Sequence, residues 1–337
     1  MLYFENDYCE GAHKAILKRL METNMEKVPG YGLDPYCDQA KEKIKTACGC
    51  PDGEVYFLVG GTQTNAVVIA SMLNRYEGVV SAVTGHVNAH EAGAIEFTGH
   101  KVLPLPQKDG KISAADLKDY LGTYYADGSY DHMVFPGMVY ISHPTEYGTL
   151  YTRQELADIS SVCREYQIPL FLDGARLGYG LVAETDVTLK EIAKYTDVFY
   201  IGGTKCGALF GEALIITAQD LKYRFKAYMK QNGAVLAKGW LMGLQFATML
   251  ESGEYFEAAK RADALAMQIK KAFEDKGVPF AVESFTNQQF VILTEQQKQE
   301  LAQKYYFEDE GDTQRFCTSW ATTEDEVDML VTDIEKL

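Results

Sequence analysis

Short apolar runs alternate with amphipathic stretches along most of the chain. Apolar, β-branched and aromatic runs predict buried strands at 55–59, 138–142, 168–172 and 197–201. Amphipathic or capped stretches predict helices at 13–23, 41–47, 116–121 and 155–166. Because strand and helix alternate over most of 55–215, we expect an α/β fold with a mainly parallel sheet flanked by helices. Such sheets bind ligands at the carboxyl ends of their strands.

The pattern changes after about residue 243. A long helix is predicted at 254–276, and a pair of strands at 280–282 and 289–293. These elements indicate a smaller α+β domain. We therefore expect an N-terminal arm at 1–12, a large domain at 13–242 and a small C-terminal domain at 243–337.

Composition narrows the class of protein. The formal net charge of −16 argues against nucleic acid or an anionic membrane as partner, because an acidic surface repels both. The seven cysteines are scattered and odd in number, which favours a reducing compartment over a disulfide framework. Acidic residues near the amino terminus are untypical of a signal peptide, and no run of eighteen apolar residues occurs. We expect a cytoplasmic enzyme.

One lysine organises the candidate chemistry. The apolar run that begins at 197 stops at a glycine pair, so that Thr204 and Lys205 follow the end of a strand in a tight turn. Almost no other charge lies within ten positions. Burial disfavours the ammonium form, which would make the Lys205 amine a nucleophile toward a carbonyl near neutral pH. A lysine that merely extends from a loop into solvent is the alternative.

A carboxylate at another strand end favours the nucleophilic Lys205 over the solvent-exposed one. Asp173 closes the apolar run at 168–172, and Arg176 follows three positions later. A carboxylate in this place can keep a pyridinium nitrogen protonated, which makes the ring an effective electron sink. A strand-end aspartate and a strand-end lysine together are what pyridoxal phosphate chemistry requires.

Four ordered motifs carry a resemblance to a known family. They are GGTQTN at 60–65, GHVNAHEAGA at 85–94, FLDGARLG at 171–178 and GGTKCGALFGEA at 202–213. With them the chain resembles the threonine aldolase and β-eliminating lyase family from about residue 4 to 320. The resemblance implies the aspartate-aminotransferase-like fold of pyridoxal 5'-phosphate enzymes. It further implies Lys205 as the lysine that bonds the cofactor and Asp173 as the partner of its ring nitrogen.

The GGTQTN motif is a candidate phosphate site. A strand, two glycines and a threonine before an apolar helix leave unpaired N–H groups that can receive an anion. Threonine at this place is more often only a helix cap. With a pyridoxal-type lysine downstream, Gly61, Thr62 and Gln63 become the expected phosphate site, and Thr204 joins them as a cofactor-binding residue beside the lysine.

Histidine and glutamate side chains are candidates for proton transfer. The family pattern of a histidine five residues before Glu-Ala-Gly selects His86, which the resemblance places stacked on the cofactor ring. His90 could support it from the same helical face, and we expect no metal. Most relatives carry a histidine where Glu146 stands here, so the base that takes the β-hydroxyl proton is Glu146, His143, His86 or an ordered water.

The resemblance also assigns substrate contacts. Arg176 and Arg315 hold the substrate carboxylate, although Arg176 has a structural pairing within its loop as its alternative. Asn6 occupies a position that faces the substrate, and Tyr31 one close to the cofactor. Relatives act as dimers or tetramers in which a loop corresponding to 231–239 reaches a neighbouring subunit's phosphate. Its usual arginine aligns with Leu236, so that Lys230 or Lys238 would have to substitute for it.

These observations predict a pyridoxal-phosphate lyase that cleaves the Cα–Cβ bond of β-hydroxy-L-amino acids such as L-threonine and L-allo-threonine, giving glycine and an aldehyde. A β-eliminating lyase or an aminotransferase acting on another small amino acid is the alternative within the same cofactor class. A non-catalytic domain that binds another phosphorylated ligand is the alternative outside this cofactor class. It does not explain why Asp173 and Lys205 stand at the ends of strands.

Overall fold

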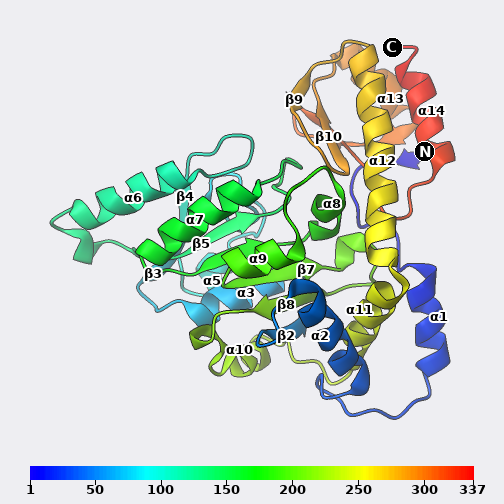
Figure 1. The fold of residues 1–337 in the computed structure, drawn as a ribbon. Coiled ribbons are helices and arrows are strands. Elements are labelled where there is room, and N and C mark those ends of the chain that lie inside the picture. The colour runs from blue at the N-terminus through cyan, green and yellow to red at the C-terminus, as the bar shows by residue number, and fades with distance from the viewer.

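The larger part of the molecule is built on one seven-stranded sheet (Figure 1). The computed structural model describes residues 1–337, apart from the side chain of Lys222. The strands lie in the order β2, β8, β7, β6, β5, β3, β4. Their bounds are β2 (Glu54–Leu58), β3 (Glu77–Ala82), β4 (Val102–Leu105), β5 (Phe135–Ser142), β6 (Leu170–Asp173), β7 (Val198–Gly202) and β8 (Glu212–Ile216). Strands β3 to β7 pair in parallel and β8 is antiparallel to both neighbours, so the expected mainly parallel sheet is confirmed.

Helices pack on both faces of this sheet (Figure 1). One face carries α1 (Lys14–Thr23), α2 (Pro35–Cys48), α6 (Ala114–Ala126), α7 (Arg153–Glu165), α8 (Leu177–Val182), α9 (Leu189–Tyr195) and α11 (Trp240–Ser252). The other carries α3 (Gly61–Met72), α4 (His86–Ala89), α5 (Ala94–Phe97) and α10 (Phe225–Gln231). Covered on both sides, β6 and β7 are buried along their whole length, which explains why both are continuously apolar up to their last residues.

The end of β6 lies unusually close to β7. A Cβ atom added at Gly174 would overlap the carbonyl oxygen of Tyr200, so only glycine allows this approach. The chain therefore leaves β6 directly beside β7. As a result, the residues that follow the two strands lie near each other.

The C-terminal region forms a second layer of structure. Its four-stranded antiparallel sheet has the order β12 (Glu308–Asp309), β13 (Gln314–Cys317), β10 (Gln288–Val291), β9 (Phe280–Val282). The sheet packs with α12 (Glu254–Asp275), α13 (Glu295–Ala302) and α14 (Glu324–Ile334) around a separate apolar core. At the amino terminus, β1 (Leu2–Tyr3) pairs with β11 (Tyr305–Tyr306), which joins the arm to this region. The division at residue 243 stays a prediction, since that position lies inside α11.

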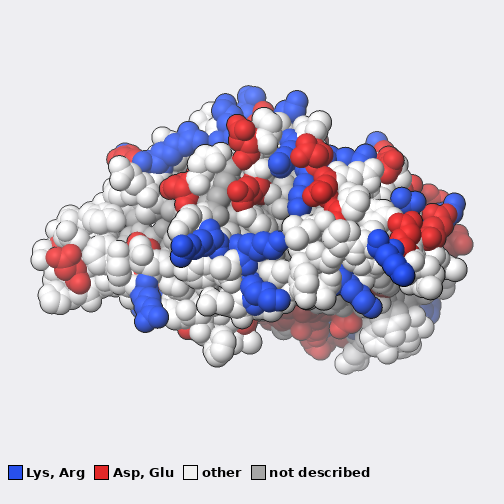
Figure 2. All heavy atoms as spheres, turned by 90° about the horizontal axis from the view of Figure 1, so that it is seen from below, with Lys and Arg blue, Asp and Glu red and all other residues white. Residues whose placement is uncertain are grey.

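Basic and acidic side chains both occur on one face of the molecule (Figure 2). On the face seen from below, lysine and arginine side chains lie among acidic ones, although the chain as a whole is acidic (Figure 2). Among the described residues, no helix combines the length and apolarity that a bilayer crossing needs.

Candidate active site

Two adjacent strands, β6 and β7, end at one edge of the sheet and bring the predicted pair together. Asp173 is the last residue of β6, and Lys205 lies in the 3-10 turn η2 (Thr204–Cys206) that follows β7. Both side chains line the same hollow, whose volume is about 350 Å³. The two residues that the strand-end argument singled out are therefore neighbours in space, as that argument requires.

Asp173 is buried and held by three donors. Its Oδ2 accepts hydrogen bonds from Asn65 Nδ2 at 3.0 Å and from the Tyr140 hydroxyl at 2.5 Å, and its Oδ1 accepts from the Ala175 N–H at 2.9 Å. Burial opposes ionisation of this carboxyl, but His86 and the hydrogen bond from Tyr140 hold its pKa below the ordinary value. Asp173 is therefore a carboxylate at neutral pH.

Lys205 has the character expected of a nucleophilic amine. Burial and the neighbouring Arg176 guanidinium lower its pKa, and this effect outweighs Asp7 and Asp173, which raise it. The Nζ lies 5.9 Å from the centre of the Tyr8 ring. A larger fraction of the neutral amine is thus present near pH 7 than for an exposed lysine.

The start of α3 offers an anion site in the same hollow. Gly61 and Thr62 line it, and the preceding Gly60 makes no side-chain cap, so the N–H groups of the first turn are not capped by that residue. Thr204 also lines the hollow and donates to Glu212 Oε1 at 2.9 Å. Gln63 points elsewhere: its Oε1 accepts from the Val59 N–H at 3.3 Å, and its Nε2 donates to the Asn232 carbonyl.

His86 begins α4 and lies between two carboxylates. Its Nδ1 lies 2.7 Å from Glu91 Oε1, and its backbone N–H donates to Glu146 Oε1 at 2.8 Å. Burial lowers the pKa of His86, but the hydrogen bond to Glu91 and the charge of Asp173 outweigh that effect and raise it. The His90 ring lies 5.7 Å from the His86 ring and lines the same hollow. Among the described residues, no group of histidines, cysteines and carboxylates could hold a metal ion.

Glu146 is the only one of the two candidates in its loop that reaches the site. Its carboxyl lines the hollow and accepts from the Ser142 hydroxyl at 2.6 Å, while burial raises its pKa. His143 is fully buried away from the hollow, where its Nδ1 accepts from the Tyr151 N–H at 3.3 Å. Burial also lowers the pKa of His143 to about 4. Because its side chain does not line the hollow, its position contradicts His143 as the base.

Arg176 makes a buried ion pair with the N-terminal arm. Its Nε and Nη2 donate to the two carboxylate oxygens of Asp7 at 2.7 and 3.0 Å, and Asn287 Nδ2 donates to the same carboxylate. Asp7 is fully buried. The structural alternative expected a partner within the arginine's own loop, whereas the partner lies in the N-terminal arm, and the contact of Arg176 with the substrate carboxylate stays a prediction. Arg176 nevertheless lines the hollow as well.

Arg315 comes from β13 and lines an adjoining hollow of about 390 Å³. Lys205, Arg176 and His86 line both hollows, so the two are continuous around these side chains. Arg315 pairs with Glu308, and its Nη1 donates to Gln288 Oε1 at 3.3 Å. The second predicted arginine therefore reaches the site from the C-terminal sheet.

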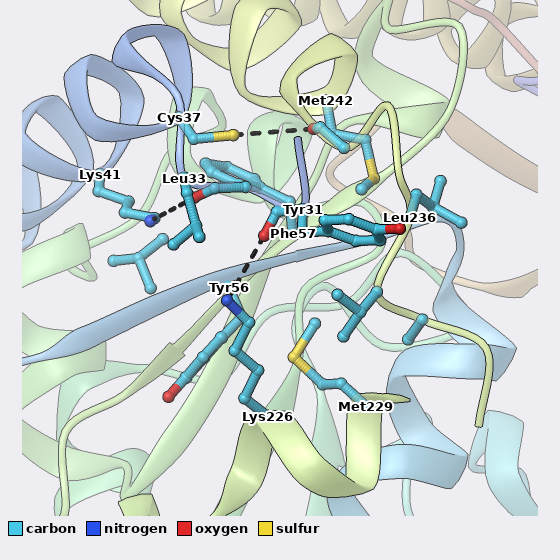
Figure 3. Close-up of a pocket in the computed structure, with 15 residues that line it drawn as sticks. Tyr31, Leu33, Cys37, Lys41, Tyr56, Phe57, Lys226, Met229, Leu236 and Met242 are labelled. Carbon is cyan, nitrogen blue, oxygen red and sulfur yellow. Dashed lines mark hydrogen bonds between the residues drawn. The ribbon is translucent and has the colours of Figure 1, made fainter. Parts of the chain in front are cut away.

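Two residues predicted to contact substrate or cofactor do not line either hollow of their own chain. The Asn6 side chain accepts from the Tyr8 N–H at 3.0 Å, and Tyr8 lines the site in its place. Tyr31 lies in a separate apolar hollow with Leu33 and Met229 (Figure 3). Its backbone has a φ of 61°, so the chain turns at this point.

The loop at 231–239 packs beside that apolar hollow. Leu236 lines it, and Lys230 lies over the Tyr31 ring with its Nζ 4.9 Å from the ring centre. The Asn232 carbonyl of this loop accepts a hydrogen bond from Gln63 Nε2, at the start of α3. Contact of this loop with a neighbouring subunit's phosphate stays a prediction.

Several residues of the site were not predicted from sequence. They are Asp7, Tyr8, Asn65, Glu91, Tyr140 and Glu212. Asn65 and Glu91 lie inside motifs that the resemblance used only as landmarks.

The comparisons agree with this geometry. A family model described as beta-eliminating lyase matches residues 6–296. A solved structure of threonine aldolase from Leishmania major is 42% identical, with a TM-score of 0.95 over 100% of this chain and 99% of that one. The low specificity L-threonine aldolase of Pseudomonas aeruginosa is 29% identical over 340 residues, covering 98% of this chain and 96% of its own.

A more distant structure shows the fold alone. Cystalysin from Treponema denticola, which contains a pyridoxal 5'-phosphate cofactor, is 15% identical, with a TM-score of 0.73 over 100% of this chain and 90% of that one. The histidinol-phosphate aminotransferase of Clostridium acetobutylicum is 12% identical, with a TM-score of 0.76 over 100% of this chain and 98% of that one. The chain therefore has an aminotransferase-like fold.

Proposed function

The chain belongs to the threonine aldolase and β-eliminating lyase family, and from that premise we propose that it cleaves β-hydroxy-L-amino acids between Cα and Cβ. L-threonine and L-allo-threonine are the expected substrates, with glycine and an aldehyde as products. The observation that carries the proposal is the shared hollow of Lys205 and Asp173, in a chain 42% identical to a threonine aldolase.

The residues of this hollow fit pyridoxal 5'-phosphate. An ionised carboxylate, a buried amine of lowered pKa and an uncapped helix start are the three groups that its ring nitrogen, aldehyde and phosphate require. The buried Tyr200 hydroxyl lines the same hollow and interacts with the Asp173 carboxylate. When bound, the cofactor withdraws electrons from the bond that breaks at Cα.

The chain's own residues orient the substrate. We assign its carboxylate to Arg176 and Arg315, which both line the outer hollow. The Asp7 pair uses Nε and Nη2 of Arg176 and fixes the direction of its guanidinium. A held carboxylate lets Lys205 and His86 meet the reacting carbon from fixed positions, which is a positioning effect on the rate.

Proton removal from the β-hydroxyl falls to Glu146 or His86. Both line the two hollows, and the Glu146 carboxyl is bound to the His86 backbone. By the family resemblance, Glu146 stands at the position of a histidine. A buried carboxyl of raised pKa and an imidazole are both able to exchange a proton near neutral pH.

The test is cleavage by the purified holoenzyme. L-threonine and L-allo-threonine should release acetaldehyde and glycine, and Lys205→Ala should abolish turnover. Lys190→Ala, an exposed change on α9, is the matched control and should keep full activity. Pyruvate from L-serine or L-cysteine without acetaldehyde would instead identify a β-eliminating lyase, and turnover by Lys205→Ala would contradict the proposal.

We also propose a cytoplasmic homodimer or homotetramer with active sites at the subunit interface. The loop at 231–239 and Tyr31 support it, because they lie beside each other on a surface that does not face their own chain's site. Sedimentation velocity should give two or four copies. A monomer with full activity would contradict this assembly.

A further inference from the structure

A buried carboxylate beside the site has no role in the reaction described so far. Glu91 follows α4, and its side chain is fully buried. Its Oε1 lies 2.7 Å from His86 Nδ1 and 3.0 Å from Asn65 Nδ2. The same Asn65 nitrogen lies 3.0 Å from Asp173 Oδ2. One amide therefore links the carboxylate beside the imidazole to the carboxylate of the strand end.

We propose that Glu91 is the positioning residue that makes His86 Nε2 the acceptor of the β-hydroxyl proton. The inference rests on the proposed function. Because a carboxylate can only accept, its contact with Nδ1 requires the proton on Nδ1. The neutral ring then carries its lone pair on Nε2. Because His86 lines both hollows, this unprotonated nitrogen is the one that can accept a proton from the substrate.

The proton transfer balances within the substrate and this histidine. The hydroxyl O–H bond breaks and an Nε2–H bond forms, while the oxygen's electron pair makes the carbonyl of the aldehyde. The electron pair of the broken Cα–Cβ bond remains with Cα, which takes up a proton to give glycine. Glu91 takes up no proton itself: it stays a carboxylate and stabilises the imidazolium that forms.

Charges from four elements face His86. Glu91 lies on its own segment, Asp173 at the end of β6, Glu146 in the turn after β5, and Lys205 in η2. The His90 ring lies 5.7 Å away. Glu91 and Asp173 favour the charged imidazole and Lys205 opposes it. Glu91 is the carboxylate in direct contact with the ring, so its charge can be tested separately.

Asn65 gives this arrangement its rigidity. Its amide nitrogen has two hydrogens, and it lies 3.0 Å from both Glu91 Oε1 and Asp173 Oδ2. Glu91 Oε2 is buried without a hydrogen-bond partner among the described residues, a placement that disfavours folding. A carboxylate kept despite that penalty is more easily explained by its effect on His86 than by packing alone.

The test compares Glu91→Gln with wild type and with Glu96→Gln, an exposed change on α5. Glutamine keeps the shape and can still accept from Nδ1–H, but it removes the charge. Imidazole NMR of the apoprotein should show the His86 pKa lowered in Glu91→Gln and unmoved in Glu96→Gln. In the holoenzyme, the acid limb of kcat against pH should move to lower pH, with kcat at least about tenfold lower and KM little changed.

Each outcome decides the proposal. An unmoved His86 titration in Glu91→Gln would overturn it, as would a loss of kcat that shifts no pH limb. If the variant does not fold, the wild-type apoprotein still decides, because its neutral His86 should carry the proton on Nδ1 and a proton on Nε2 would contradict the assignment. Failure of wild-type threonine cleavage would overturn the proposed function instead, while the NMR result would still report on Glu91.

Discussion

Residues of the site differ in how far along the chain their partners lie. Lys205 and Asp173 could be predicted, because each follows an apolar strand and stands beside glycines that mark its end. The pair of Arg176 and Asp7 could not, since 169 positions separate them and neither local sequence contains the other. Long-range polar pairs of this kind leave no periodic signal.

The carboxylate of Asp173 should be essential beyond its shape. Asp173→Asn keeps the size of the side chain but removes the charge that holds a protonated ring nitrogen, and its NH2 group cannot accept the hydrogen bonds that one of the two carboxylate oxygens receives. We expect kcat for L-threonine to fall about 100-fold or more. Steady-state kinetics of the holoenzyme measure this, with exposed Asp119→Asn on α6 as control. Unchanged kcat in Asp173→Asn would remove the carboxylate from the mechanism.

Arg315 should act on substrate binding. A charge-assisted hydrogen bond to a carboxylate contributes about 1.5–3 kcal/mol, so Arg315→Ala should raise KM for L-threonine roughly 10- to 100-fold. The exposed Arg75→Ala is the control. A wild-type KM with reduced stability would instead indicate that the pair with Glu308 is only structural.

Elements were more predictable in type than in orientation. Strands β5, β6 and β7 and helices α7 and α12 lie where the apolar pattern placed them, to within a few residues. Strand β8 is antiparallel, and this was not expected, because a fully buried strand has the same apolar sequence in either direction. The boundary near 243 was set by a change in pattern, whereas α11 continues through that position and packs on α2.

Helix α12 contains a buried group whose effect depends on pH. Both carboxyl oxygens of Asp263 are buried without a hydrogen-bond partner among the described residues, and burial raises its pKa to about 9. An unfolded aspartate titrates near about 3.9. Between these values the unfolded state has lost a proton that the folded state keeps, so this group lowers the free energy of unfolding as pH rises.

Asp263→Asn should therefore stabilise the protein at pH 8. We expect the free energy of unfolding of the apoprotein to rise by at least about 1 kcal/mol, with the gain shrinking toward pH 4. Urea denaturation at several pH values measures it, with exposed Glu274→Gln on the same helix as control. A gain that is equal at all pH values would mean that ionisation of Asp263 is not the cause.

The whole molecule places its site between two layers of structure. Asp173 ends a strand of the large sheet and Lys205 follows another, Arg315 comes from β13 of the C-terminal sheet, and Asp7 comes from the arm. The fold class followed from the alternation of strand and helix. The way in which the arm and the C-terminal sheet meet the large sheet could not be predicted, because it depends on pairings such as β1 with β11 across 300 residues of chain.

The most direct test of the central claim is the attachment point of the cofactor. Purified protein with bound pyridoxal 5'-phosphate is reduced with borohydride, digested and analysed by mass spectrometry. The account predicts the pyridoxyl group on the peptide that contains Lys205. Peptides that contain an exposed lysine such as Lys190 should carry no stoichiometric label. Stoichiometric labelling of a different lysine, or full threonine cleavage without any label, would contradict it.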